Sequence, residues 1–151
     1  MSTATVRVSI KRLPHGRDIP LPCKMTEHAA GFDLHAAVTE PIPLAPGAIR
    51  LIPCGFAMAV PPGYEAQVRP RSGLASKFGI SMPNAPGTID ADYRGEVMVP
   101  LINHGQSDFI VERGMRIAQM IVARHARVAW TETDTLPETG RGSGGFGSTG
   151  A

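Results

Sequence analysis

Glycine and proline recur along the whole chain, and their spacing restricts the fold more than any other feature of the sequence. There are 17 glycines and 14 prolines among 151 residues, and the segments between them are short. Glycine loses much conformational entropy when it is ordered, and proline lacks a backbone donor, so neither suits the interior of a long helix. Many short segments separated by turn residues are typical of an all-β sandwich or barrel.

The segments between the turns have the composition of strands. They alternate apolar with polar residues, or they are rich in β-branched side chains. The expected strands cover residues 6–10, 48–52, 56–60, 65–69, 96–99, 109–111, 117–122 and 126–130. Pro100 lies in an otherwise apolar strand, and it predicts a sheet edge or a β-bulge because proline cannot donate to a ladder.

One segment predicts a helix. Residues 72–79 begin with serine, a favoured N-cap residue, and end with glycine, which suits the position after a helix. Good helix formers lie between these two residues. We therefore expect one or two helical turns here and no other helix.

A change of pattern divides the chain. A hydrophobic content of 42% is sufficient for one globular domain, but the strand pattern stops near residue 131. We therefore expect a β-barrel domain over residues 1–130, followed by a flexible, glycine-rich C-terminal arm over residues 131–151.

Composition argues against several classes of protein. No apolar run reaches the length of a membrane span, and the N-terminus lacks the apolar core of a signal peptide, so we expect a cytoplasmic protein with no membrane partner. A net charge of +2 with 5% aromatic residues gives little support to a nucleic-acid partner. Cys23 and Cys54 are too few for a disulfide framework, and we expect both to be buried as small apolar residues.

The start of the expected helix suits an anion. Arg71 and Ser72 stand where free backbone N–H groups, a hydroxyl and a guanidinium can meet a phosphate. From these residues alone, a capped turn with solvated arginines is the alternative.

Acidic residues mark two further candidates. Asp90 and Asp92 follow a turn, and they point to the same side if the stretch is extended, with Tyr93 opposite. Two close carboxylates suit a cation or the activation of a water, although turn acids that face solvent have the same pattern. Asp33 lies in an apolar run, and a buried carboxylate there needs partners or a cation unless backbone N–H groups of a turn satisfy it.

The arm combines glycines with an arginine, one aromatic ring and a Ser-Thr pair. These are suitable groups for binding a phosphate and covering a flat ring, although a disordered chain end has a similar composition.

Five segments resemble, in order, the five motifs of the trimeric deoxyuridine triphosphatases. Their sequences are AGFDL at 30–34, RPRSG at 69–73, GTIDADYRGE at 87–96, GMRIAQ at 114–119 and RGSGGFGST at 141–149. Because no motif departs in residue type and all five occur in order, the resemblance is highly specific. It implies a jelly-roll-like β subunit in a homotrimer, with active sites at subunit interfaces, each completed by a neighbour's C-terminal arm.

The resemblance also implies a reaction. Water would attack the α-phosphorus of dUTP with the help of Mg²⁺ and release dUMP and pyrophosphate. Such an enzyme, a dUTP diphosphatase, limits the incorporation of uracil into DNA and supplies dUMP for thymidylate synthesis.

Each matched residue acquires an implied role. Asp90 would accept a proton from the attacking water, Asp33 would hold water ligands of Mg²⁺, and Phe146 would cover the uracil ring. The substrate-binding residues implied are Arg71, Ser72, Gly73, Asn84, Gly87, Thr88, Ile89, Tyr93, Met98, Gln119, Arg141, Phe146, Gly147, Ser148 and Thr149.

Other functions stay open at this level. A dCTP deaminase of the same superfamily needs a carboxylate beside the pyrimidine C4 position, whereas residues 84–89 carry no charge. A non-catalytic β-trimer that binds nucleotides or a protein would not need a water-activating acid. Release of ammonia from dCTP would support the first alternative, and absence of pyrophosphate from dUTP the second.

Overall fold

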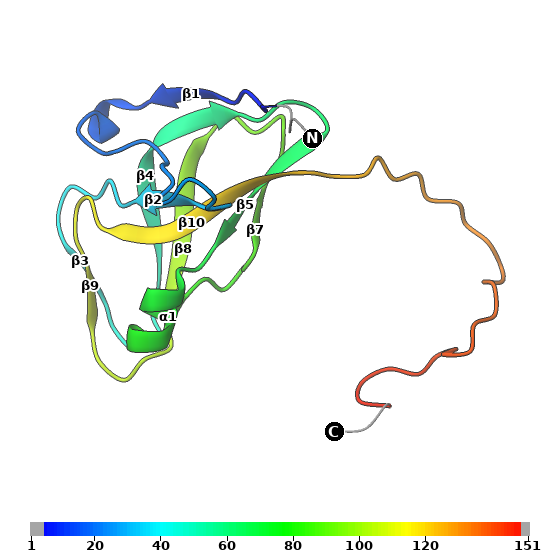
Figure 1. Ribbon diagram of the computed structural model, residues 1–151. Helices are drawn as coiled ribbons and strands as arrows, with labels where there is room; N and C mark the ends of the chain where they lie inside the picture. Colours follow the sequence, from blue (N-terminus) through cyan, green and yellow to red (C-terminus); the bar gives the residue numbers. More distant parts are fainter. Residues whose placement is uncertain (1–4, 149–151) are drawn as a thin grey trace.

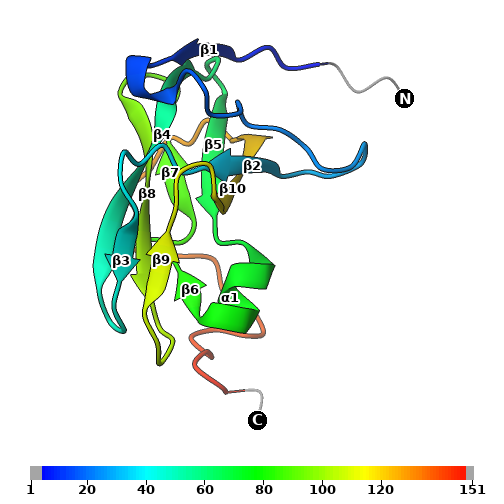
Figure 2. The ribbon, with the colours of Figure 1, turned by 90° about the vertical axis from the view of Figure 1, so that its left-hand side faces the viewer.

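Two four-stranded antiparallel sheets form the body of the protein in this computed structural model, which describes residues 5–148 (Figure 1). The first sheet has the strand order β1-β4-β8-β6, and the second has the order β2-β10-β5-β7. Strands β3 and β9 pair separately and lie side by side in Figure 2. The prediction of an all-β sandwich with one short helix is confirmed.

The strand bounds explain how short segments build these sheets. They are Ser9–Arg12 for β1, Phe32–His35 for β2, Ile42–Leu44 for β3, Ile49–Ala59 for β4, Tyr64–Arg69 for β5, Ile80–Ser81 for β6, Gly87–Ile89 for β7, Glu96–Asn103 for β8, Phe109–Val111 for β9 and Arg116–Arg124 for β10. A 3₁₀ turn at Pro14–Gly16 was not expected from the sequence.

The two sheets enclose one apolar core. Strand β8 shows the underlying alternation, since Val97, Val99 and Leu101 are buried while Met98 points outward. Side chains from the second sheet, such as Leu34 and Ala118, belong to the same buried cluster. The 2.0-residue period of a strand therefore gives each sheet an inner and an outer face.

Two expected strands are in fact one. All but the outermost residues of 48–52 and 56–60 fall within β4, Ile49–Ala59, whose register against β8 shifts between Pro53 and Ala57. Within this shift, Gly55 has φ +74°, and a Cβ there would lie 2.6 Å from the Cα of Gly16. Glycine is required because two backbones meet at this point.

The predicted helix is present as α1, Ser72–Phe78, and it is the one α-helix among residues 5–148. Its end agrees with the prediction, because Gly79 adopts a left-handed conformation with φ +70° and its N–H bonds to the carbonyl oxygens of Ala75 and Leu74. Its start does not: the N-cap residue is Arg71, and Ser72 is already helical. The Ser72 side chain is therefore not used as a cap.

Pro100 lies where β8 is paired on one side, which agrees with the expected sheet edge. In the register of β8, Pro100 pairs with Leu51 on β4, while β6 on the other side reaches only Ile102 and Asn103. The missing donor of Pro100 therefore costs no ladder bond on the β6 side.

The expected strand at residues 126–130 is not formed. The ladder between β10 and β5 ends where Arg124 pairs with Tyr64, the first residue of β5, so within residues 5–148 the segment after Arg124 has no neighbouring strand. Val128 and Trp130 are consequently exposed, and this segment runs away from the sheets in Figure 1. The expected strand at 6–10 begins later for the same reason, because β4 ends at Ala59, the partner of Ser9.

The two cysteines differ in burial. Cys54 is buried as expected, but Cys23 is exposed, which corrects the prediction for that residue. Cys23 precedes β2 and joins Asp33 by an isolated bridge outside the core. No helix within residues 5–148 combines the length and apolarity needed to cross a membrane.

Candidate active site

One pocket gathers residues from three of the five motifs. Its volume is ≈ 530 Å³. The candidate residues that line it are Asp33, Arg71, Ser72, Gly73 and Gln119. We call this hollow, which lies between β2, β10 and the start of α1, the β2–β10 pocket.

Strand register explains why these residues meet. Gln119 on β10 pairs with Asp33 on one side and with Arg69 on the other. Strand β5 ends at Arg69, and the chain enters α1 after Pro70 and Arg71. Neighbouring strands lie about 4.8 Å apart, so three distant segments of the sequence reach one site.

The charges in the pocket are paired within the chain. The Asp33 carboxylate, whose side chain is 13% exposed, lies 3.4 Å from Arg71 Nε and 3.1 Å from Arg116 Nη1. Arg71 Nη1 also donates to the carbonyl oxygen of Arg116 at 3.2 Å. The partners of this acid are two arginine side chains, in addition to its own backbone pairing in β2.

The Gln119 side chain lies between Pro70, which follows β5, and Gly31, which precedes β2. Its Nε2 donates to the carbonyl oxygen of Pro70 at 3.0 Å. Its Oε1 faces Gly31, where an added Cβ would lie 2.6 Å from that oxygen. Gly31 therefore leaves space for the Gln119 amide at the pocket wall.

His35 lies behind the pocket and was not singled out by the sequence. It is buried, pairs across the ladder with Arg116, and its Nδ1 has no partner among the residues that the structure describes. Burial lowers the pKa of His35, and the positive charges of Arg116 and Arg71 act in the same direction, against the effect of Asp33. A neutral imidazole is favoured beside two guanidinium groups.

The third-motif residues lie elsewhere. Among the described residues that line the β2–β10 pocket there is no member of the segment from Asn84 to Met98. Strand β7, which carries Gly87, Thr88 and Ile89, is the edge strand opposite β2 in its sheet. Strands β10 and β5 separate those edges, so Asp90, which follows β7, lies across the width of the sheet from β2.

The β7–β8 turn, residues 90–95, has a different shape from the extended one considered for the sequence. Ala91 and Asp92 form a turn closed by a bond from the Tyr93 N–H to the Asp90 carbonyl oxygen at 3.2 Å. The geometry that would put Asp90 and Asp92 on one side of a strand is therefore absent from this turn. Tyr93 donates from its hydroxyl to the carbonyl oxygen of Glu96 at 2.9 Å and stays 45% exposed.

Asn84 and Met98 flank this region. Asn84 is exposed, and its Nδ2 would lie 3.2 Å from a Cβ added to the buried Gly87. Met98 lies on the outer face of β8, where it pairs with Pro53. In the single chain these residues adjoin the turn rather than the pocket.

The fifth-motif residues extend beyond the body of the protein. Arg141 Nε donates to the carbonyl oxygen of Gly144 at 2.8 Å, and the Ser148 N–H donates to Gly145 at 3.0 Å. Phe146 is fully exposed, and Gly147 follows it. Thr149 lies outside the described residues.

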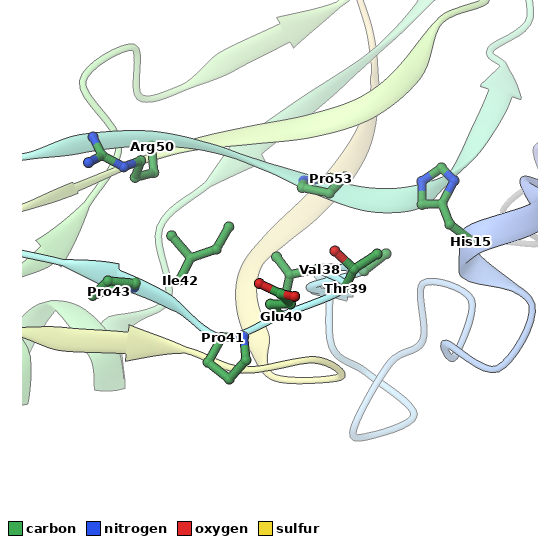
Figure 3. Close-up of a pocket in the computed structure, with 10 residues that line it drawn as sticks. His15, Val38, Thr39, Glu40, Pro41, Ile42, Pro43, Arg50 and Pro53 are labelled. Carbon is green, nitrogen blue, oxygen red and sulfur yellow. The ribbon is translucent and has the colours of Figure 1, made fainter.

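A second hollow contains none of the predicted site residues. Figure 3 shows it beside the start of β4, where His15, Glu40 and Arg50 are its titratable side chains and prolines form much of the wall. Across residues 5–148, no three His, Cys, Asp or Glu side chains gather closely enough to hold a metal ion.

Comparisons with known proteins identify the family to which the chain is similar. The dUTPase family model matches residues 17–150. A deoxyuridine 5′-triphosphate nucleotidohydrolase from Maricaulis maris is 60% identical over 149 residues, which cover 97% of this chain and 98% of the relative. The protein of the same name from Rickettsia massiliae is 60% identical over 144 residues, covering 95% and 97%.

Solved structures agree in fold. A mutant dUTPase from Staphylococcus bacteriophage 80alpha, described with dUpNHpp, has a TM-score of 0.87 at 23% identity and covers 97% of this chain and 100% of its own. A mutant dUTPase from phage phi11 of S. aureus, described with a structural Mg(II) ion, has a TM-score of 0.77 at 19% identity, with 87% and 99% covered.

Proposed function

We propose a complete reaction for this chain, which belongs to the dUTPase family. Membership makes it a hydrolase that acts on dUTP. The proposal adds that water attacks the α-phosphorus, that the products are dUMP and pyrophosphate, and that Mg²⁺ assists. It also places the enzyme in the cytoplasm, where it lowers the dUTP available to DNA synthesis and supplies dUMP for thymidylate synthesis.

The observation that carries the proposal is the convergence of Asp33, Arg71 and Gln119 in the β2–β10 pocket. Arginine binds phosphate through a planar fork of donors, and the Gln119 amide and Ser72 hydroxyl add neutral donors. A triphosphate supplies the acceptors that such a pocket requires.

The residues of the pocket fit Mg²⁺ as an ion that arrives with the triphosphate. Asp33 is the one carboxylate among the described residues that line it. Mg²⁺ usually keeps several waters and binds through one or two carboxylates together with substrate phosphates. Asp33 would hold such waters, and the ion would supply neutralisation of phosphate charge.

Asp90 is the proposed general base. It is exposed on the β7–β8 turn, where it can accept a proton from water. Tyr93 would pack beneath the deoxyribose, with its hydroxyl already engaged by Glu96. Phosphoryl transfer depends mainly on alignment and charge neutralisation, so this division between base and phosphate ligands is chemically sufficient.

A homotrimer would bring the separated parts together. Asp90 lies across the sheet from the pocket, and Phe146 projects from a segment with no strand partner, so neither completes the pocket in its own chain. The outer face of β4 and β8 carries Ile49, Leu51 and Met98, which are 50%, 57% and 37% exposed. Apolar surface of this kind supports contact with another subunit.

The reaction is tested by measuring pyrophosphate release from dUTP, dTTP and dCTP with Mg²⁺. We expect dUTP to be preferred over dCTP by about 10⁴-fold, because a mismatched base edge leaves buried polar groups unpaired. Thymine has the same hydrogen-bonding edge as uracil, so a preference over dTTP would depend on excluding its 5-methyl group. No release from dUTP would contradict the proposal, and ammonia release from dCTP would support a deaminase instead. Sedimentation of the same sample at assay concentration would test the trimer.

A further inference from the structure

We propose that Arg116 is a positioning residue, which orients the Asp33 carboxylate toward the magnesium–triphosphate substrate. This inference rests on the proposed function, because it assigns the way in which the same pocket couples Mg²⁺ to nucleotide. Arg116 acts through Asp33 and contributes no atom to the reacting centre.

A β-bulge brings Arg116 into the pocket. In a regular strand, residues three apart point to opposite faces, so Arg116 and Gln119 would lie on opposite sides of β10. The register against β2 instead shifts between Arg116 and Ala118, with Arg116 opposite His35 and Ala118 opposite Leu34. Ile117 and Ala118 are both buried, as an extra residue at this point requires.

The bulge therefore places two functional side chains of β10 on one face. Arg116 and Gln119 both line the β2–β10 pocket. On β2, Asp33 and His35 are two residues apart and share a face, so the side chain of Arg116, which lies opposite His35, reaches diagonally to Asp33, the residue that Gln119 pairs with. Bulges often redirect a side chain next to an active site.

The two carboxylate oxygens of Asp33 have different partners. Oδ2 accepts a bond from Arg116 Nη1 at 3.1 Å, while Oδ1 lies 3.4 Å from Arg71 Nε. The contact to Arg116 is the shorter, and it is a hydrogen bond. The contact to Arg71 is longer, so it is the one that can be exchanged at lower cost.

This division suits a change of partners when substrate binds. Arg71 is the guanidinium proposed to bind phosphate, and its movement toward phosphate would free Oδ1 for water ligands of Mg²⁺. Arg116 would still hold Oδ2, so the acid would keep both a countercharge and its orientation. Groups that orient the partner of a metal in this way commonly change metal affinity by about 10–100-fold when removed.

Stability alone does not account for Arg116. Its side chain is 41% exposed, and partly exposed ion pairs stabilise a fold only weakly. Its contact with Arg71 is made by the backbone carbonyl oxygen, which any residue at this position would retain. Substitution of the side chain should therefore leave both the fold and that contact in place.

The test compares Arg116→Ala, Arg116→Lys and the wild-type chain by isothermal titration with dUpNHpp, with and without Mg²⁺. The measured quantity is the factor by which Mg²⁺ tightens binding. We expect Arg116→Ala to reduce that factor about tenfold. Lysine should restore most of it, because one donor to Oδ2 is sufficient. Arg124→Ala is the matched control, since Arg124 is on the same strand and contacts Tyr64 outside the pocket.

A second set of variants, made in the Asp33→Asn chain, shows whether Arg116 changes the Mg²⁺ factor by way of Asp33. In Asp33→Asn, adding Arg116→Ala should change the Mg²⁺ factor by less than about twofold, because the shared interaction is already lost. An equal loss in both backgrounds, or an unchanged factor in Arg116→Ala, would overturn the positioning role while leaving the hydrolase intact. Failure of the wild-type chain to bind dUpNHpp at all would instead count against the proposed function.

Discussion

The β2–β10 pocket and the C-terminal segment, residues 125–148, are opposite kinds of structure in one chain. The pocket is braced by three paired strands and by contacts among Asp33, Arg71 and Arg116. The C-terminal segment is exposed, and its bonds near Arg141 join residues only three positions apart. Asp33, Arg71 and Arg116 are thus held in place by contacts within the single chain, whereas the residues of the C-terminal segment that we propose to complete the site have only local contacts.

Asp90→Asn should have the greatest effect, because it removes the proposed base and leaves the β2–β10 pocket intact. We expect kcat to fall about 10³-fold, within the usual range for loss of a general base. Binding of dUpNHpp, measured by titration calorimetry, should stay within a few-fold of the wild type because the pocket is unchanged. Near-normal turnover would remove Asp90 from the role of base.

A truncation after Gly140 tests the role of the C-terminal segment. It deletes Arg141 and Phe146 without touching either sheet, so thermal unfolding should be unaltered. We expect kcat/KM for dUTP to fall about 10²-fold, the cost of poor alignment and an open site. Full activity in the truncated protein would exclude a covering role for this segment.

Co-expression of the truncated chain with Asp90→Asn tests whether sites are shared. Each chain lacks a different group, so mixed assemblies contain some sites with an intact base and an intact C-terminal segment. We expect mixed assemblies, purified through two affinity tags, to exceed either parent in activity. Activity no higher than that of the parents would mean that one chain supplies both groups to a site.

Gly31→Ala tests how exactly the pocket is arranged. The new Cβ would displace Gln119 Oε1, and we expect kcat/KM to fall about tenfold, less than a full 1 Å misplacement would cost. Thermal stability should change little, because the displaced atom is the end of a flexible side chain. In a Gln119→Ala background, Gly31→Ala should not lower kcat/KM any further. An equal loss of kcat/KM in that background would mean that the substitution acts by disturbing the backbone of the loop before β2.

The last prediction compares the buried core with the exposed segment before β2. Burial raises the pKa of Cys54 to about 12, so its thiol stays protonated at pH 8, while Cys23 is exposed before β2. Iodoacetamide at pH 8 should label Cys23 and leave Cys54 unmodified, as read by peptide mass spectrometry. Labelling of Cys54 in the folded protein would show that the core around β4 opens.

Local patterns predicted the parts of the fold that depend on neighbouring residues. The alternation in β8 and the Gly79 terminus of α1 are local, and both were visible in the sequence. Strands β3, β6 and β7 were not, because each is two or three residues long and is defined by its pairing partner; β9 is equally short but was predicted, since its three residues are aromatic or β-branched. The pattern at 126–130 predicted a strand, but this segment finds no pairing partner in the part of the chain that the structure describes.

The candidate site divides in the same way. The motif residues were all recognisable by type and order, but Arg116 was only a weak signal because the bulge that redirects it depends on register with β2. Likewise, nothing local indicates that His35 is buried between charged neighbours.

The fold class, the family and the residue types of the candidate site could be read from the sequence, because these depend on residue type and short-range spacing. The meeting of Asp33, Arg71, Arg116 and Gln119 in one pocket, with Asp90 beyond the opposite edge of the same sheet, is visible in the folded chain alone. Strand order and register bring distant segments together, and they arise from long-range pairing that no short stretch of sequence encodes.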